Sequence, residues 1–382
     1  MKQIILFIAF CMTVFVSSAQ VQLSESAEIS VITCSPGDDL YNTFGHSAIR
    51  VQDAGWGIDV VYNYGTFSFG GSSMGEQLDF GLTFMRGQLL YWVSVSSFDN
   101  FVASYEYQER WVYEQVLNLS QAEKQSLFDE LTENAKEENK YYRYDFFFDN
   151  CSSRIRDILV NSLGDVYGTE ESIVHQSTDK SFIDLIDSYI VDNVWLDFGI
   201  DILLGSKSSA KATPYEYMFL PDYLMSETEK AEGLVKDSYY VIPFEIRQEK
   251  EQIASSFTPF IFFMVLMGLI LFISIFNFKR NKHWFWLDRI LLLITGVVGC
   301  LFLFMWLGTN HLAAHTNLNM LWAFPLNIIA VFFVGKKKFR PYCILILVLS
   351  VINLIGFSFL QDFHFAIIPI LLLLIVRYAK MV

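Results

Sequence analysis

A single cysteine, Cys151, lies where a reactive thiol would be placed. It follows Asn150, a favourable helix N-cap, and it begins a run that ends at Gly164, a favourable helix stop. Apolar residues recur through this run at helical spacing, at Ile155, Ile158, Leu159 and Leu163. A thiol at a helix N-terminus faces free N–H groups and the positive end of the helix dipole, and both favour the thiolate. The pattern indicates a nucleophile, and a small buried core residue is the alternative.

A thiol nucleophile also needs a base, and the best candidate is His46 in the stretch FGHSAIRV. The stretch from His46 to Asp53 alternates as a strand does. A histidine on a strand is often only a packed side chain. Its place after Phe44-Gly45, in the same chain as the Cys151 motif, favours general-base catalysis.

The two parts of the chain differ in charge. The whole chain carries 27 Lys and Arg against 41 Asp and Glu, a net charge of −14. Residues 257–382 contain ten of these basic and two of these acidic residues, so residues 1–256 hold the acidic excess. An acidic domain is a poor partner for nucleic acid. No phosphate-binding loop or dinucleotide fingerprint occurs, and no cofactor is predicted.

The first residues resemble a secretory signal peptide. A lysine precedes an apolar run from Ile4 to Val16, and Ser17 and Ala19 fit the −3 and −1 positions of a cleavage site. We therefore interpret residues 1–19 as a signal peptide and expect the residues that follow to lie outside the cytoplasm. An uncleaved anchor is the alternative, but the run is short for a membrane span.

Residues 20–256 are expected to form an exported α+β domain, because several strands are followed by helices. The expected strands are Glu28–Thr33, His46–Asp53, Ile58–Phe67, Gln88–Ser96 and Trp111–Leu119. A helix is expected over Phe98–Gln108, and Ser120 with Glu123 forms a capping box for another that reaches about Ala135. The polar stretch Ser226–Glu251 is interpreted as a helix or a linker to the membrane.

Residues 257–382 are expected to form an all-α membrane domain of five transmembrane helices. The apolar segments are 257–278, 287–307, 319–335, 341–360 and 363–378, of which the third and fifth are short. All ten basic residues of this part flank the segments on one side, which the positive-inside rule makes cytoplasmic. The N-terminal domain then lies on the outer side of a bacterial inner membrane, in agreement with the signal peptide.

The outer loop between the second and third segments carries polar side chains at the membrane surface. They are His311, His315, Asn317, Asn319 and Trp322. Polar groups near a membrane are costly without a use, so we interpret them as ligands for a phosphate or glycerol group, with an ordinary interfacial loop as the alternative. His311 and His315 share a helical face, but no acid follows His311 as in a zincin, and no metal is predicted.

Three further charged residues could lie near the active site. Arg154 could bind a phosphate headgroup, although such an arginine more often pairs with a nearby acid such as Asp149. Asp197 and Asp201 are four residues apart and share one face of an apolar helix within Phe182–Leu204. We expect a solvated stripe on a helix near the membrane surface.

Several motifs together resemble a known family. FGHSAIRV on an early strand, YNYG on the next and DNCSSRIRD at a later helix resemble the NlpC/P60 papain-like superfamily. The histidine precedes the cysteine, as in the circularly permuted lecithin:retinol acyltransferase group. The closer resemblance is to the Lnb N-terminal periplasmic domain family. It extends over most of residues 28–225, through YNTFGHSAIRV, YNYGTFSF, EENKYYRYDFFFDNCSSRIRD, DFGIDILLG and MFLPDYL, and the five apolar segments fit full-length Lnb.

This resemblance implies a lipoprotein N-acyltransferase. Cys151 would take an acyl chain from a phospholipid as a thioester and pass it to the N-terminal amine of a lipoprotein, with His46 as base. Asn63 would orient His46, since permuted relatives place a polar orienter on that strand. Asp59 is its rival, because the two share a face. The oxyanion would lie near the N–H groups of Cys151 and Ser152.

Two other functions stay open at this point. A cell-wall amidase or endopeptidase is the usual activity of NlpC/P60 relatives, but one anchoring helix would suffice for it. A non-enzymatic membrane sensor with a degenerate papain-like domain is the second, and the intact pair Cys151 and His46 disfavours it. Cys34 is the other exported cysteine, and a disulfide between Cys34 and Cys151 would silence the enzyme.

Overall fold

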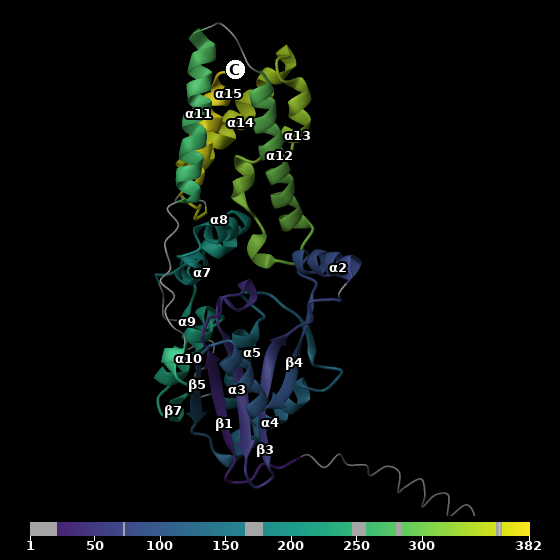
Figure 1. The fold of residues 1–382 in the computed structure, drawn as a ribbon, viewed down its shortest axis with the longest axis vertical. Coiled ribbons are helices and arrows are strands. Elements are labelled where there is room, and N and C mark those ends of the chain that lie inside the picture. Colours follow the sequence, from purple (N-terminus) through teal and green to yellow (C-terminus); the bar gives the residue numbers. More distant parts are fainter. Residues whose placement is uncertain are drawn as a thin grey trace, which may run out of the picture.

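The computed structural model describes residues 21–71, 73–164, 179–246, 257–279, 285–356, 359 and 361–382. The expected signal peptide, residues 1–19, lies outside them. Figure 1 shows two parts placed end to end, an α+β domain (the N-terminal domain) and a helical domain (the membrane domain). The α+β class and the order of the two parts agree with the sequence-based prediction.

The N-terminal domain is built on a seven-stranded antiparallel sheet. The strands lie in the order β6 (Tyr141–Arg143), β4 (Leu90–Ser97), β3 (Ile58–Thr66), β2 (His46–Asp53), β1 (Glu28–Cys34), β5 (Val112–Leu117) and β7 (Val235–Ile242). The five strands from β1 to β5 were predicted within two residues at either end, whereas β6 and β7 at the two edges were not predicted.

Helices cover both faces of this sheet. Helices α4 (Gln121–Asn134) and α5 (Cys151–Leu163) pack together on one face, where α5 contacts β2 and β3. Helix α3 (Phe98–Tyr107) packs on the other face. The capping box of Ser120 and Glu123 is present at the start of α4, as predicted. The apolar positions of α5 are buried against the sheet, so the helix and the thiol at its beginning are held firmly.

Three segments differ from the prediction. The stretch Ser226–Glu251 is not a linker in its described part, since it continues α10 (Pro221–Lys230) and then forms β7 on the edge of the sheet. The helix expected within Phe182–Leu204 is two, α7 (Phe182–Ile190) and α8 (Val194–Leu203), because Asn193 caps a new start. Helix α2 (Met74–Met85) follows a Gly-Ser loop and was not predicted.

The membrane domain contains four of the expected apolar helices. They are α11 (Pro259–Lys279), α12 (Phe285–Leu307), α14 (Arg340–Ile355) and α15 (Ile367–Ala379). Within the described residues, three helical stretches are long and apolar enough to cross a bilayer, and α15 is shorter. The membrane assignment of residues 257–382 therefore rests on α11, α12 and α14.

The third expected span, 319–335, is not a continuous helix. It consists of short turns, η5 (Leu318–Leu321), α13 (Asn327–Ala330) and η6 (Val331–Phe333), which we call the broken segment. Its backbone lies against two glycines of α12. A Cβ atom on Gly299 would lie 1.9 Å from the Ala323 carbonyl oxygen, and one on Gly296 would lie 2.5 Å from a backbone nitrogen. Residues 319–335 thus pack closely on α12 as short turns and do not form one continuous helix.

The two domains are joined at the end of α8. The carbonyls in the last turn of a helix have no intrahelical partner. The membrane domain supplies partners: Asn317 Nδ2 donates to the Ile202 carbonyl at 2.8 Å, and Gln361 Nε2 donates to the Leu204 carbonyl at 3.1 Å. The backbone adds a bond of 2.7 Å from the Gly205 N–H to Ala313. The two domains therefore meet through specific hydrogen bonds at this junction.

A buried ion pair ties the other end of the membrane domain together. Arg377 of α15 donates to Asp288 of α12 at 2.8 and 2.5 Å, and to the Ser274 hydroxyl of α11 at 2.7 Å. Both charged side chains are almost fully buried, at 3% and 1% exposed. Each charge is costly in that setting unless the other is present.

We predict that Arg377→Leu strongly destabilises the protein, because it removes the guanidinium that neutralises the buried Asp288 carboxylate. The expected loss is about 3–5 kcal/mol in the free energy of unfolding. The double variant Arg377→Leu/Asp288→Leu should recover most of it. Thermal unfolding in detergent measures both effects, with the exposed Arg289→Leu as matched control. Equal stability of the single and double variants would show that the loss does not come from the uncompensated charge of Asp288.

Candidate active site

The Cys151 thiol is positioned by the cap of α5. The Asn150 side chain accepts a hydrogen bond from the Ser153 N–H at 2.9 Å, and the Ser153 hydroxyl accepts one from the Asn150 N–H at 2.8 Å. The Asn150 amide also donates to the carbonyls of Phe146 and Phe219, each at 2.8 Å. The helix begins at Cys151, as the sequence predicts, with the N–H groups of its first two residues free of intrahelical acceptors.

His46 and Asn63 lie together next to the thiol. Nε2 of His46 and Oδ1 of Asn63 are 2.5 Å apart. Because an amide oxygen only accepts, Nε2 carries the hydrogen, and Nδ1 is the basic nitrogen. Gly65 marks how closely these groups meet, since a Cβ atom there would lie 3.7 Å from Cys151 Cβ and 4.0 Å from His46 Cε1. Its φ of +86° accompanies a shift in the pairing of β3 with β4.

The surroundings of Cys151 favour its thiolate. Burial on its own would raise the pKa of the thiol. The charge of His46 and its hydrogen bond to the sulfur act in the opposite direction, as do the Ser47 N–H and the Ser152 hydroxyl, and the pKa falls to about 7. A thiol with a pKa near 7 is substantially ionised at neutral pH, which is what a nucleophile requires.

Cys34 differs from Cys151 in its burial and in the pKa of its thiol, the two properties that decide whether a cysteine is reactive. It lies on β1 opposite His46 in the ladder and is fully buried. Burial raises the pKa of its thiol to about 12. Both cysteines are free, so the structure contains no disulfide between Cys34 and Cys151.

Asp59, the alternative to Asn63, is engaged elsewhere. It shares the face of β3 with Asn63, but both its oxygens accept hydrogen bonds of 2.8 Å from the Arg50 guanidinium. Arg50 also contacts Glu114 at 3.0 Å and lies 3.4 Å above the Phe98 ring. Asp59 therefore belongs to an ion network in the sheet with the buried Arg50 and Glu114, whereas Asn63 contacts His46.

A pocket opens beside His46 and Asn63. It has a volume of about 430 Å³ and is lined mainly by aromatic and polar side chains, among them Tyr41, Phe67 and Tyr105. This size lies within the range of sites that bind small molecules or parts of larger ones.

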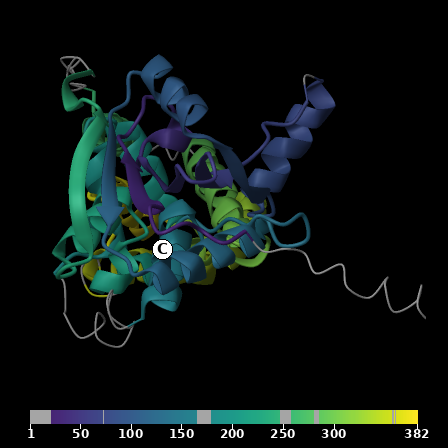
Figure 2. The same cartoon turned by 90° about the horizontal axis from the view of Figure 1, so that it is seen from below.

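A row of aromatic rings leads from this pocket to the membrane domain. Tyr41 and Phe67 line the pocket, with ring centroids 6.1 Å apart. Phe69 contacts both, and Phe80 and Phe84 of α2 continue the row at 6.0 and 6.3 Å. The Phe84 carbonyl accepts a hydrogen bond of 3.2 Å from His311 of the membrane domain. Figure 2 shows α2 standing out from the rest of its domain.

Arg154 is not a free phosphate ligand. Its guanidinium donates to both oxygens of Asp149, at 2.5 and 2.9 Å, and lies 3.6 Å above the Tyr142 ring. This is the pairing that the sequence offered as the alternative. Arg154 thus contributes to the packing of the turn that precedes Cys151.

The polar residues of the outer loop also differ from the headgroup ligands expected there. Asn317 and Asn319 are buried and donate to the Ile202 carbonyl at 2.8 and 3.3 Å. Trp322 is buried too and donates to the Asn319 side chain. These three side chains hold the domains together, because the end of α8 needs donors there.

His311 and His315 do not act as a pair. His311 donates to the Phe84 carbonyl of α2, whereas Nε2 of His315 lies 3.5 Å from the Thr309 carbonyl. His311 therefore lies where the aromatic row meets the membrane domain.

Sequence reasoning missed some residues of this site. Ser47 of β2 contacts the thiol and was not predicted, whereas for Ser152 of α5 the N–H was predicted to take part but the hydroxyl, 2.9 Å from that of Ser47, was not. Both adjoin a predicted catalytic residue, and this adjacency was the available signal. Helix α2 and its phenylalanines had no such signal, because they lie on neither catalytic strand.

Two family models match the chain. Residues 18–176 match the Lnb N-terminal periplasmic domain, and residues 249–382 match the Lnb transmembrane domain. The two matches cover most of the chain, and they place the N-terminal domain in the periplasm and the C-terminal domain in the membrane. No curated protein and no solved structure matches.

We predict that alkylation of Cys151 follows a pKa of about 7. The pKa is lowered, so the thiolate is present above pH 7 and is lost as the pH falls through that value. In His46→Ala, burial still raises the pKa of the thiol, but the charge and hydrogen bond of His46 no longer lower it. The pH midpoint of Cys151 alkylation should therefore move above 9. A charged alkylating reagent, read by mass spectrometry of the Cys151 peptide, measures both profiles. Cys34→Ser is the control and should behave as the wild type does. An unchanged midpoint in His46→Ala would contradict this account of the thiol.

Proposed function

The chain belongs to the Lnb family, with its N-terminal periplasmic domain and its transmembrane domain, and on this premise we propose that it is a lipoprotein N-acyltransferase. It would move an acyl chain from a phospholipid, through a thioester on Cys151, to the N-terminal amine of bacterial lipoproteins. The observation that carries the proposal is the thiol at the capped start of α5, with a pKa near 7, beside a histidine that Asn63 orients.

In the first half of the reaction, the Cys151 thiolate attacks the ester carbonyl carbon of the phospholipid. The oxyanion forms next to the N–H groups of Cys151 and Ser152, at the positive end of α5. The carbon–oxygen bond to glycerol breaks, and the departing oxygen takes the proton held on His46 Nδ1. The products are the acyl thioester and a lysophospholipid.

In the second half, the free amine of the lipoprotein attacks the thioester carbonyl carbon. His46 accepts a proton from the attacking nitrogen, the carbon–sulfur bond breaks, and Cys151 returns as the thiolate. Asn63 keeps the hydrogen of His46 on Nε2 in both halves, so Nδ1 stays available for proton transfer. The reaction forms one amide and requires no cofactor.

The arrangement of the domains supports a substrate that comes from the bilayer. A phospholipid ester lies near the headgroup boundary, and its extraction into water would cost about 0.8 kcal/mol for each exposed CH₂ group. The aromatic row from α2 to the pocket offers apolar contacts along the way. One side of α2 is also exposed and apolar, through Met74, Leu78, Leu82 and Met85.

A peptidoglycan amidase or endopeptidase is the alternative from another class. Such an enzyme acts on a polymer away from the bilayer, whereas here the end of α8 is fixed to the membrane domain by Asn317 and Gln361. This contact favours the acyltransferase. A non-enzymatic sensor would have no need for a thiol with a lowered pKa.

We predict a thioester intermediate on Cys151. Protein incubated with labelled phospholipid, without an acceptor, should carry label that neutral hydroxylamine releases. Cys151→Ala should carry none, and His46→Ala should form it at least 100-fold more slowly, because general-base catalysis contributes roughly 10²–10⁴-fold. Mass spectrometry of lipoprotein N-termini, in cells with and without the protein, tests the second half. Normal acylation in cells carrying only Cys151→Ala would refute the proposal.

We also predict that the apolar side of α2 lies in the membrane surface. Leu78→Glu should lower the rate with bilayer phospholipid by about tenfold or more, since one buried leucine contributes about 1.5–3 kcal/mol. Alkylation of Cys151 should be unaffected, because Leu78 lies outside the site. Gln77→Glu adds the same charge at an exposed neighbouring position and serves as the control. Equal rates for the two variants would show that α2 does not take part in lipid binding.

A further inference from the structure

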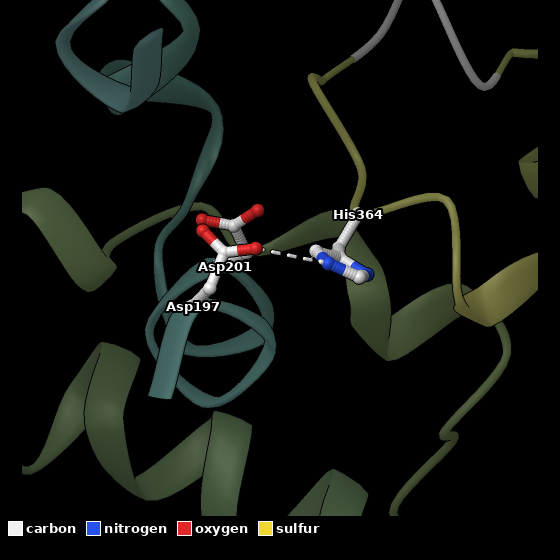
Figure 3. A group of neighbouring side chains, drawn as sticks. All are labelled: Asp197, Asp201 and His364. Atoms are coloured by element: carbon white, nitrogen blue, oxygen red, sulfur yellow. Dashed lines mark hydrogen bonds and ion pairs between the residues drawn. The ribbon is translucent and has the colours of Figure 1, made fainter. Parts of the chain in front are cut away.

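A group of ionisable side chains lies at the junction of the two domains, away from Cys151. Asp197 and Asp201 project from one side of α8, and His364 comes from the segment before α15 (Figure 3). The potential ligand atoms of these three residues all lie within 4.8 Å of one another. The spacing of the aspartates predicted a shared face, as observed. The expected solvated stripe was wrong, because Asp201 is only 5% exposed.

Within the described part of the chain, this negative charge has no positive partner besides His364. Asp187 of α7 adds a third carboxylate beside Asp197 and Asp201. One oxygen of Asp187 and one of Asp201 are buried without a hydrogen-bond donor among the described groups, and the only side chains that the two carboxyl groups share hydrogen bonds with in this group are other carboxyl groups. Buried carboxylate oxygens without partners are costly.

His364 is held in a way that excludes it as a metal ligand. Its Nδ1 accepts a hydrogen bond of 3.0 Å from the Ala366 N–H, so the neutral ring carries its hydrogen on Nε2. Nε2 points at Asp197 Oδ2, 3.2 Å away, and donates to it. A histidine in this state orients a carboxylate for an ion, as groups behind metal ligands commonly do.

We propose that this group binds a divalent cation of the hard, oxygen-preferring class, of which Ca²⁺ fits best. Asp197 and Asp201 would be its direct ligands, with the charge of Asp187 beside them and His364 orienting Asp197. Calcium takes oxygen ligands at about 2.3–2.6 Å, so two ligands on opposite sides of the ion lie roughly 4.6–5.2 Å apart. The ligand atoms of Asp197 and Asp201 lie within 4.8 Å of each other, a span that the flexible coordination of calcium accommodates, whereas magnesium demands near-ideal octahedral geometry.

Such an ion would strengthen the contact between the domains. Both proposed ligands lie on α8 of the N-terminal domain, with Asp187 of α7 beside them, and His364, which orients Asp197, belongs to the membrane domain. Helix α7 also packs near the active site, because Phe182 contacts Phe147 and Phe219 in the cluster that the Asn150 amide borders. The cation would thus stabilise the support of the catalytic helix without touching the substrate.

Thermal unfolding of the full chain in detergent, after EDTA treatment, tests the proposal. Calcium at about 100 times its Kd should raise Tm by roughly 5–10 °C. Equilibrium dialysis with elemental analysis should find one calcium ion per chain. Magnesium should bind more weakly, and zinc should bring no comparable shift. A larger shift with zinc than with calcium would overturn the assignment to an oxygen site.

Asp201→Asn should abolish the calcium shift, while Asp192→Asn, an exposed neighbour with the same charge change, should retain it. In EDTA, Asp201→Asn should be at least as stable as the wild type, because it removes one of the repelling carboxylates. This second measurement separates loss of the site from misfolding. The proposal is wrong if the wild type binds no calcium at millimolar concentration, if Asp201→Asn keeps the full shift, or if Asp201→Asn is less stable in EDTA.

Discussion

The geometry of the candidate active site depends on the hydrogen bonds of one side chain, that of Asn150. Its oxygen caps α5, and its amide holds the carbonyls of Phe146 and Phe219, which belong to two other parts of the chain. Because the side chain is buried and fully bonded, the loss of any one bond would leave polar groups unsatisfied. The thiol, the cap and the aromatic cluster around α7 are therefore fixed together.

The same principle explains how the two domains meet. Helix α8 ends with carbonyls that its own backbone cannot satisfy, and the side chains of Asn317, Asn319 and Gln361 supply the donors. A helix of one domain is thus capped by the other. This arrangement accounts for asparagines in an apolar environment, where an uncompensated amide would be costly.

Much of the fold followed from local patterns, and the remainder depended on contacts between distant segments. His46–Asp53 and Cys151–Leu163 were predictable because alternation, a cap and a stop all agreed. Strand β7 was not predictable, because an edge strand exposed on much of its surface has no clear alternation. Within the site, only the structure shows that Asp59 pairs with Arg50 and that Asn63, not Asp59, contacts His46. The cluster of Asp187, Asp201 and His364 comes from three separate segments, so no spacing revealed it.

The broken segment has a consequence for the biogenesis of the protein. A hydropathy scale counts apolar side chains, but lipid also demands that every backbone N–H and C=O be bonded. Residues 319–335 meet that demand only turn by turn, with short bonds such as that from the Ala323 N–H to the Asn319 carbonyl. They pack on α12, where Gly296 and Gly299 leave room for them and the Thr295 hydroxyl accepts a hydrogen bond of 2.9 Å from the Asn327 amide. They are therefore a poor substrate for independent release from the translocon into the bilayer. We therefore expect the segment to enter the membrane together with α12, on which it packs.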